Sequence, residues 1–163
     1  MFFADDFFRS DVAWPIQLKD AYNKTGKSVI SLIEVDDEGT SKYGIVSMSD
    51  NDGKDRLHRL TGFVEKPGPE LAPSHFASVG SYLLTPEIWP ILEQEKVGHG
   101  GEIGIADSLE ELAKTGELYG LFIDGVWHDT GDQLKYIKAV VDLALESEEY
   151  GAELTEFLKQ RLS

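Results

Sequence analysis

The sequence predicts a mixed α/β fold, with a mixed sheet flanked by helices, on two observations. Short runs rich in β-branched and aromatic residues, typical of strands, alternate with longer segments whose apolar residues recur at helical spacing. Hydrophobic residues make up 41% of the 163 residues, which is enough to build a core at this length. We therefore expect a folded domain, or a large part of one, rather than a disordered chain.

The first segments are predicted to be a strand, a helix and a strand. Residues 1–4 are apolar and predict a short buried strand that runs into two acids. Residues 16–24 predict a helix, because Pro15 suits a first helical turn and Gly26 suits a helix end. Residues 28–35 are rich in β-branched side chains and predict a central strand.

The middle of the sequence predicts three more strands and the start of a helix. Residues 43–48 and 56–64 predict a hairpin around the polar tip at 50–55. After a proline-rich loop, residues 77–84 predict another strand. The segment Thr85-Pro86-Glu87 predicts a helix start, since proline is favoured at the first helical position.

The last third is predicted to be mostly helical. Glycines within residues 98–101 break the preceding helix, and residues 103–114 resume helical spacing. Residues 118–123 and 126–127 predict two short strands. Further apolar residues at helical spacing predict amphipathic C-terminal helices, and these residues are Leu134, Ile137, Val141, Ala144, Leu145, Leu154, Phe157, Leu158 and Leu162.

Acidic residues dominate the charge of the chain. Lys+Arg 15 and Asp+Glu 30 give a formal net charge of −15, which disfavours binding to nucleic acid and to anionic membrane surfaces. No run reaches the ~18–20 apolar residues that a membrane span needs, and no basic segment that would mark a signal peptide precedes residues 1–8. The sequence has no cysteine, which fits a reducing compartment, so we expect a cytoplasmic protein.

An apolar strand that ends in Asp5-Asp6 is typical of a strand whose carboxyl end faces a ligand site in an open α/β sheet. Such a strand is normally buried between neighbours, yet this one lies at the first residues, and no glycine-rich phosphate loop precedes it. We therefore expect that an upstream half of the domain is missing from this sequence. A short native protein with an atypical edge strand is the alternative.

Two aspartates at predicted strand ends, Asp5 and Asp129, suit a magnesium site, because Mg²⁺ typically takes one or two carboxylates and completes its shell with water and substrate phosphates. The alternative is that Asp5 caps a turn and Asp129 caps the helix that begins near Asp132, and for either residue alone capping is the favoured interpretation.

Lys66 is the cation best placed to bind a phosphate. It follows a predicted strand, and Pro67 biases its backbone toward extended conformations. A single lysine is usually a solvated surface charge. However, a chain with a net charge of −15 needs local cations to capture a phosphorylated substrate, and a lysine together with Mg²⁺ would supply them.

In this order, the motifs of the sequence resemble those of the nucleoside-diphosphate-sugar pyrophosphorylase family, most closely its bacterial UTP–glucose-1-phosphate uridylyltransferases. The resemblance spans residue 4 to about residue 150. Its motifs are Ala4-Asp5-Asp6, Tyr43-Gly44-Ile45-Val46, Gly62-Phe63-Val64-Glu65-Lys66-Pro67, the stretch Ser78 to Ile88, Gly100-Gly101-Glu102-Ile103 and Asp129-Thr130-Gly131-Asp132.

The resemblance implies a Rossmann-like nucleotidyltransferase fold, lacking here its N-terminal nucleotide-binding half, and formation of UDP-glucose and pyrophosphate from UTP and glucose 1-phosphate. It implies that residues 1–130 are the sugar-phosphate-binding part, and that residues 131–163 are a C-terminal helical segment and a candidate contact in a homodimer or homotetramer. It also implies roles for six residues: Asp5 and Asp129 as Mg²⁺ ligands, Lys66 on the sugar phosphate, Glu65 on sugar hydroxyls, and Gly44 and Gly80 where backbone approaches the sugar. Lys66 and Asp5 are thereby the predicted catalytic residues.

Three departures from the family pattern matter. Gly104-Ile105-Ala106-Asp107 replaces the usual Leu-Thr-Asp after the Gly-Gly-Glu-Ile turn, so the family pattern does not set where the local helix begins. The glycine-rich motif that cradles the nucleotide triphosphate has no counterpart, so we expect weak activity or none from this chain alone, and His128 stands where the family commonly has an aromatic or aliphatic residue. Two alternatives are kept: another NDP-sugar pyrophosphorylase, such as one that forms dTDP-glucose, and a non-catalytic sugar-phosphate-binding or oligomerisation module.

Overall fold

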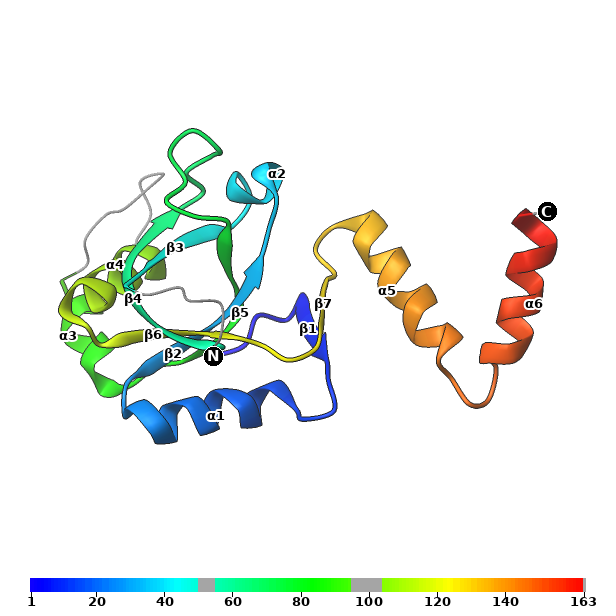
Figure 1. Cartoon of the computed structure of the whole chain (residues 1–163), viewed down its shortest axis with the longest axis horizontal. Helices are drawn as coiled ribbons and strands as arrows, with labels where there is room; N and C mark the ends of the chain where they lie inside the picture. Colours follow the sequence, from blue (N-terminus) through cyan, green and yellow to red (C-terminus); the bar gives the residue numbers. More distant parts are fainter. Residues whose placement is uncertain (50–54, 95–103, 163) are drawn as a thin grey trace.

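Five strands close into a barrel that forms the body of the molecule (Figure 1). The structure, a computed structural model, describes residues 1–49, 55–94 and 104–162. In barrel order, the strands are β2 (Ser28–Glu34), β5 (Phe76–Leu83), β3 (Gly44–Met48), β4 (Leu57–Glu65) and β6 (Leu118–Phe122). Only the β2–β6 pair is parallel, and the other pairs are antiparallel. The sheet is therefore mixed, as predicted, whereas its closure was not predicted.

A second, two-stranded sheet stands beside the barrel. Strand β1 (Asp6–Arg9) pairs antiparallel with β7 (Val126–Asp129), and Asp6 lies opposite Asp129. The two short strands predicted around residues 118–127 therefore belong to different sheets. This pairing joins the start of the described chain to its last third, and it brings together acids that are far apart in the sequence.

Helices cover the barrel on two sides, and two more extend beyond the small sheet. The helices are α1 (Trp14–Thr25), α2 (Asp37–Thr40), the 3₁₀ turn η1 (Pro86–Ile88), α3 (Trp89–Leu92), α4 (Ile105–Thr115), α5 (Gln133–Leu145) and α6 (Gly151–Leu162). Helix α1 ends as predicted, at Gly26 with φ 65°, a left-handed conformation that glycine adopts without strain. No helix in the described part of the chain is long and apolar enough to cross a membrane.

The main core lies between the barrel and α4. Leu109 and Leu112 of this helix are buried against Ile30, Leu32 and Leu60 of the barrel. Removing a fully buried leucine side chain typically costs about 2–5 kcal/mol of stability, so this contact holds the end of the barrel in place.

The prediction of a buried strand at residues 1–4 is wrong. Residue Phe2 forms only an isolated bridge to Ser81 of β5, and the side chains of Phe2 and Phe3 are 53% and 40% exposed. One edge of this segment is hydrogen-bonded to β5, through Phe3 N–H to Gly80 O at 2.8 Å and Tyr82 N–H to Met1 O at 3.0 Å. Within the described residues, no strand covers its other edge.

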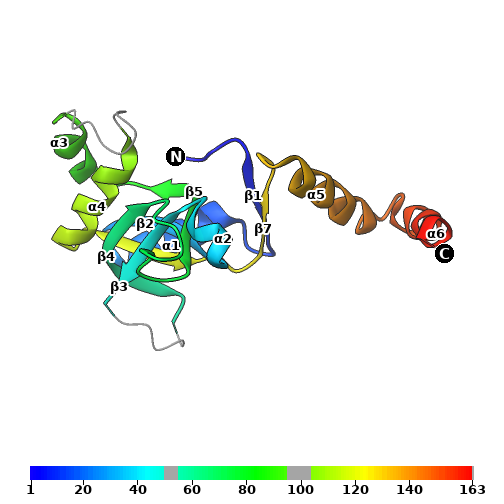
Figure 2. The same ribbon diagram turned by 90° about the horizontal axis from the view of Figure 1, so that it is seen from above.

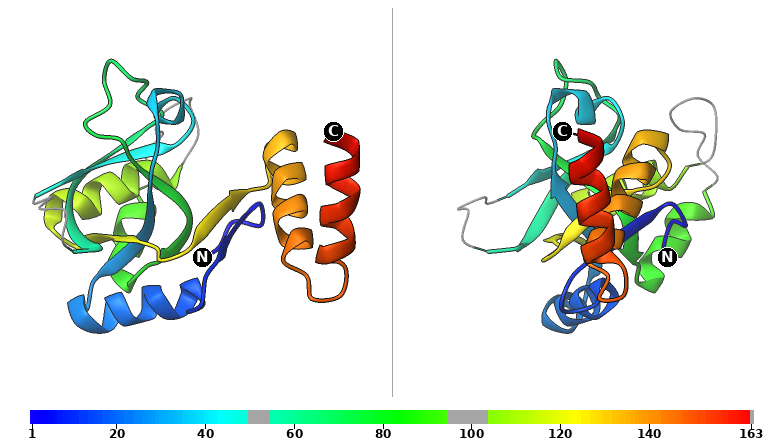
Figure 3. Two further views of the ribbon diagram at one scale, coloured as in Figure 1. Left: turned by 45° about the vertical axis from the view of Figure 1, so that its right-hand side comes forward. Right: turned by 90° about the vertical axis from the view of Figure 1, so that its right-hand side faces the viewer.

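The C-terminal helices form where predicted, but their apolar faces are not buried in the described chain. Figures 2 and 3 show α5 and α6 side by side as a helical hairpin that projects from the small sheet, away from α3 and α4. Leu134, Ile137 and Phe157 are at least half exposed, and in α5 only Ala139 is buried.

The predicted hairpin of β3 and β4 is present, and its two strands pair antiparallel. Its tip at 50–54 and the glycines at 98–101 lie outside the described residues.

Candidate active site

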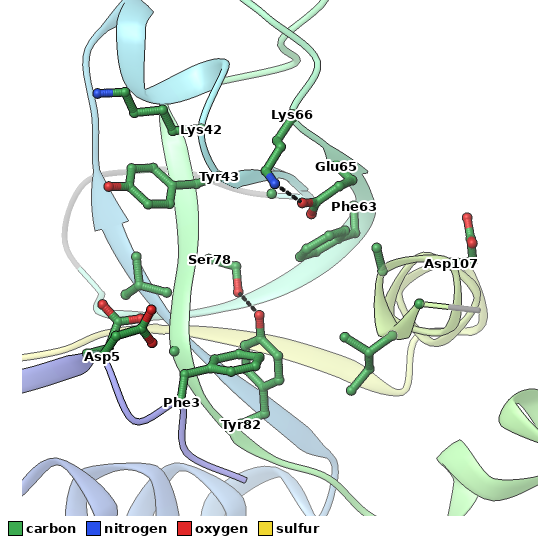
Figure 4. A pocket seen from close by; sticks show the side chains of 17 residues that line it. Phe3, Asp5, Lys42, Tyr43, Phe63, Glu65, Lys66, Ser78, Tyr82 and Asp107 are labelled. Atoms are coloured by element: carbon green, nitrogen blue, oxygen red, sulfur yellow. Dashed lines mark hydrogen bonds and ion pairs between the residues drawn. The ribbon is translucent and has the colours of Figure 1, made fainter. Parts of the chain in front are cut away.

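A cavity of ≈ 520 Å³ opens between the barrel, the residues before β1 and the start of α4 (Figure 4). Five of the six residues predicted for the site line it: Asp5, Gly44, Glu65, Lys66 and Gly80. In Figure 4, Asp5 lies on one side of the cavity and the pair Glu65 and Lys66 on another. The sixth residue, Asp129, lies beside Asp5 rather than on the cavity lining.

The β1–β7 pairing makes Asp5 and Asp129 neighbours. Thr130 holds the backbone, because its N–H and its hydroxyl donate to Asp5 O at 2.7 Å and 2.9 Å. A Cβ atom placed on Gly131 would lie 3.1 Å from Asp5 Oδ2 and 3.3 Å from Asp129 Oδ1, so both carboxylates face the same small space. The structure therefore brings these two carboxylates together.

The capping interpretation fails for Asp129. The N-cap of α5 is Asp132, whose Oδ1 accepts a hydrogen bond from the Lys135 backbone N–H at 2.9 Å. Instead, Asp129 Oδ1 accepts from the Gly131 N–H at 3.0 Å. Among the described residues, the Asp5 carboxylate accepts no hydrogen bond, so it caps no turn there.

Asp129 is held as an anion by two side chains that the sequence did not suggest. Its Oδ2 accepts from Tyr43 Oη at 2.7 Å and from Lys135 Nζ at 2.9 Å. Burial by itself raises the pKa of Asp129, but the donors Lys135, Tyr43 and Gly131 together outweigh burial and leave that pKa below its usual value.

Asp6 behaves in the opposite way. Burial, together with the nearby charges of Asp5 and Asp129, raises the pKa of Asp6, although a hydrogen bond from Trp127 Nε1 at 2.7 Å partly counteracts this. The carboxylate of Asp6 also fills the space over Gly80, where an added Cβ would overlap it. The glycine at position 80 is therefore required by packing against Asp6.

Lys66 has a strained backbone, contrary to the prediction of an extended one. Its φ of 46° is the only positive value at a described non-glycine residue. Its N–H donates to Tyr43 O at 3.2 Å and the N–H of Gly68 to Thr40 O at 3.1 Å, so the neighbouring loop holds this turn against the preference set by Pro67. Such a conformation costs about 1–3 kcal/mol and clusters at functional sites. Here it directs the ammonium to 3.4 Å from Glu65 Oε1.

The wall of the cavity that contains Glu65, Ser78 and Tyr82 suits the hydroxyl groups of a ligand. Tyr82 Oη accepts a hydrogen bond from Ser78 Oγ at 3.2 Å, and burial, with the charges of Glu65 and Asp6, raises the pKa of Tyr82. A Cβ at Gly44 would overlap the Phe63 ring, so packing against this ring requires the glycine, and Glu65 Oε2 lies close by, 3.1 Å from where such a Cβ would be. The wall thus combines one carboxylate acceptor with neutral hydroxyl groups.

Asp5 and Asp129 fit a magnesium ion in type and number. Both offer hard oxygen atoms to one space, and Mg²⁺ typically uses one or two carboxylates and takes its remaining ligands from water and phosphates. No group of three acidic or histidine side chains that could hold a metal occurs in the described ranges. The ion would therefore depend on substrate oxygens for much of its shell.

Sequence reasoning missed the parts played by Tyr43, Trp127 and Lys135. Lys135 lies six positions after Asp129, a spacing that carries no signal until the turn at Thr130 and Gly131 places the first turn of α5 beside the end of β7. His128, another departure from the family pattern, is buried and stacks on Phe7 with ring centres 4.7 Å apart, so it packs as an aromatic residue would.

Comparisons with known proteins agree with one another. The family model described as nucleotidyl transferase matches residues 1–146. UTP–glucose-1-phosphate uridylyltransferase 2 of Staphylococcus saprophyticus subsp. saprophyticus is 39% identical over 156 residues, which are 96% of this chain and 53% of the relative. A crystal structure of a UDP-glucose pyrophosphorylase complexed with UDP-glucose superposes with TM-score 0.78 at 34% identity, covering 85% of this chain and 52% of that chain. A UDP-glucose pyrophosphorylase from Acinetobacter baumannii gives TM-score 0.80 at 26% identity, covering 96% and 54%. The chain thus spans about half the length of the relatives it matches.

Proposed function

The chain belongs to the nucleotidyl transferase family, and from this we propose that it carries the sugar-phosphate-binding part of a UTP–glucose-1-phosphate uridylyltransferase. In the reaction, a phosphate oxygen of glucose 1-phosphate attacks the α-phosphorus of UTP, giving UDP-glucose and pyrophosphate. The observation that carries the proposal is that Asp5, Glu65 and Lys66 meet at one cavity. The names of the relatives support the choice of UTP and glucose.

Lys66 would hold the phosphate of the sugar. Its ammonium faces the cavity, whereas the chain as a whole carries a net charge of −15 and repels anions. The strained backbone of Lys66 supports the role, because strained backbone conformations cluster at functional sites, where the surrounding structure holds them in place. The ion pair with Glu65 is long, at 3.4 Å, so the ammonium can turn toward an incoming phosphate.

Glu65 would accept hydrogen bonds from two sugar hydroxyls. A sugar without those hydroxyls would leave the carboxylate unpaired in the cavity, which costs affinity. Gly44 and Gly80 line the cavity and would let the backbone come close to the sugar. The chemistry needs no protein nucleophile, because phosphoryl and nucleotidyl transfer depend on positioning and on electrostatic stabilisation.

Asp5 and Asp129 would hold Mg²⁺, which would supply positive charge to neutralise the reacting phosphates. Asp129 is suited to this because its hydrogen bonds keep it ionised, and Asp5 because its carboxylate has no competing donor among the described residues. Asp5 and Lys66 would then act on the same phosphate from different sides of the cavity.

Calorimetric titration of the chain with glucose 1-phosphate tests the proposal. We expect binding that Lys66→Met weakens at least tenfold, since it removes a charge-assisted hydrogen bond worth about 1.5–3 kcal/mol. Lys19→Met, on the exposed face of α1, makes the same change in net charge and should leave binding unaltered. Equal losses in the two variants, or no binding by the parent chain, would refute the assignment of the cavity.

Release of pyrophosphate from UTP and glucose 1-phosphate tests the reaction itself. The sequence contains no glycine-rich phosphate loop after a strand, so we expect turnover by this chain alone to be weak. Glucose 1-phosphate binding is therefore the more direct measurement.

We also propose a homodimer or homotetramer in the cytoplasm. The exposed apolar residues of α5 and α6, among them Ile137, Val140 and Phe157, support an interface on residues 131–163. Light scattering should give a mass of at least twice 18.1 kDa, and Ile137→Glu should reduce it to that of a monomer. The cytoplasmic location is supported by the absence of cysteine and by the phosphorylated substrates.

A further inference from the structure

Lys135 reaches the site from the first turn of α5. Its Nζ donates to Asp129 Oδ2 at 2.9 Å and to Tyr43 Oη at 2.8 Å. The same ammonium lies 5.2 Å from the centre of the Trp127 ring and 5.4 Å from that of Tyr43, within the range of cation–π attraction. The hydrogen bond between its backbone and Asp132 fixes where the side chain starts. These five contacts leave the ammonium little freedom to move.

The two carboxylates of the proposed metal site therefore differ. Asp129 Oδ2 receives two donors, one of them charged, whereas Asp5 receives none among the described residues. With both acids ionised the pair carries two negative charges, and Lys135 reduces the total to one. The position of Lys135 beside Asp129 follows from the order of elements, because α5 is the next element after β7, which ends at Asp129.

We propose that Lys135 is a positioning residue that orients Asp129 and, by its charge, weakens the hold of Asp5 and Asp129 on a divalent cation. The inference rests on the proposed function, since it takes these aspartates to be the ligands of the ion. A positive charge that shares a carboxylate with a divalent ion repels the ion, and in water-like, salt-screened surroundings such repulsion would lower affinity by about threefold to thirtyfold. The ion is then bound firmly only when substrate phosphates complete its shell.

Binding of Mn²⁺ alone to the 163-residue chain, followed by electron paramagnetic resonance, tests this without any measurement of turnover. Lys135→Met should tighten Mn²⁺ binding by at least threefold. Lys138→Met changes the net charge equally from an exposed position on the same helix and should leave the affinity at the parent value. Lys135→Arg keeps the charge and should also keep the parent affinity. Thermal unfolding of each variant shows whether α5 remains folded.

The outcomes separate the two proposals. Loss of Mn²⁺ binding in Asp5→Asn, with tighter binding in Lys135→Met alone, supports both. Loss in Asp5→Asn with an unchanged or weaker affinity in Lys135→Met overturns the inference about Lys135 and leaves the metal site standing. Mn²⁺ binding that survives Asp5→Asn, or that is absent from every variant, overturns both. If Lys135→Met and Lys138→Met tightened Mn²⁺ binding equally, the change in net charge alone would explain the effect, and this would also overturn the inference.

Discussion

The indole Nε1 of Trp127 donates a hydrogen bond to Asp6 Oδ1 at 2.7 Å, and this bond ties β7 to the start of β1. Asp6 needs the donor, because it is partly buried near two other acids and burial raises its pKa. Trp127 in turn packs edge-on against Tyr43, with ring centres 5.4 Å apart. One side chain thus supports both Asp6 and the residues that orient Asp129.

Replacing Trp127 by Phe should destabilise the chain by about 1.5–3 kcal/mol, because it removes a hydrogen bond to a charged group and leaves a partly buried carboxylate less well paired. Urea denaturation followed by circular dichroism measures the change. The control is Trp89→Phe, since Trp89 is 62% exposed and should tolerate the substitution within about 0.5 kcal/mol. Equal effects of the two substitutions would contradict a structural role for the Trp127–Asp6 bond.

The raised pKa of Asp6 predicts a stabilising substitution whose effect depends on pH. An acid with a higher pKa in the folded than in the unfolded state binds its proton more tightly when folded. The charged form of Asp6 therefore lowers the free energy of unfolding. This loss is complete at pH values above the pKa of the folded state, and it disappears at pH values below the pKa of the unfolded state.

Asp6→Asn keeps an oxygen acceptor for Trp127 and removes the charge. In metal-free buffer with chelator, we expect it to raise stability at pH 7 by up to about 1 kcal/mol after solvent screening, and to lose that advantage near pH 3. Thermal unfolding at the two pH values checks this. Asp11→Asn, at an exposed residue, should show neither effect. A gain of the same size at pH 3 and pH 7 would mean that charge is not its cause.

Gly80→Ala should impair both stability and ligand binding, because the new Cβ would overlap the Asp6 carboxylate and force it out of place. We expect a loss of about 1–3 kcal/mol, typical of overpacking, together with weaker glucose 1-phosphate binding. Gly62→Ala is the matched control in β4, where the nearest atom, Ser47 Oγ, would lie at an ordinary 3.4 Å. Unfolding and calorimetry measure the two effects. A wild-type-like Gly80→Ala would show that Asp6 is free to move.

The sequence predicted the order of elements well wherever local signals determine the structure. Pro15 and Gly26 mark the ends of α1, and β-branched residues mark β2, because these preferences act within a few residues. The prediction at residues 1–4 was wrong because burial of an apolar strand depends on neighbours, which local patterns do not reveal. The closed barrel likewise depends on long-range pairing, such as that of β4 with β6.

The site was predictable as far as motifs reach. Asp5, Glu65 and Lys66 were identified from their positions at predicted strand ends and from the resemblance to a known family, and they do line one cavity. The left-handed backbone of Lys66 was not predicted, because Pro67 locally favours an extended one and the hydrogen bond of the Lys66 N–H goes to Tyr43, which is distant in sequence. The contact between Lys135 and Asp129 could not be predicted either, because it depends on the direction that α5 takes after the turn.

The backbone of Lys66 offers a test in which stability and binding should change separately. At φ 46°, glycine is favoured over alanine by about 1 kcal/mol, so Lys66→Gly should be more stable than Lys66→Ala. At Lys19, inside α1, the order should reverse, because glycine is the poorer helix former by about 1 kcal/mol.

Both Lys66 variants should lose glucose 1-phosphate binding alike, since each lacks the ammonium, whereas both Lys19 variants should keep it. Chemical denaturation gives the stability order, and calorimetry gives the binding. If Lys66→Ala were as stable as Lys66→Gly, the left-handed conformation would be refuted. If either Lys66 variant bound the sugar phosphate as the parent chain does, the lysine would have no part in holding it. Because the two readouts depend on different atoms of one residue, the strain of the backbone and the charge of the side chain can be assigned independently.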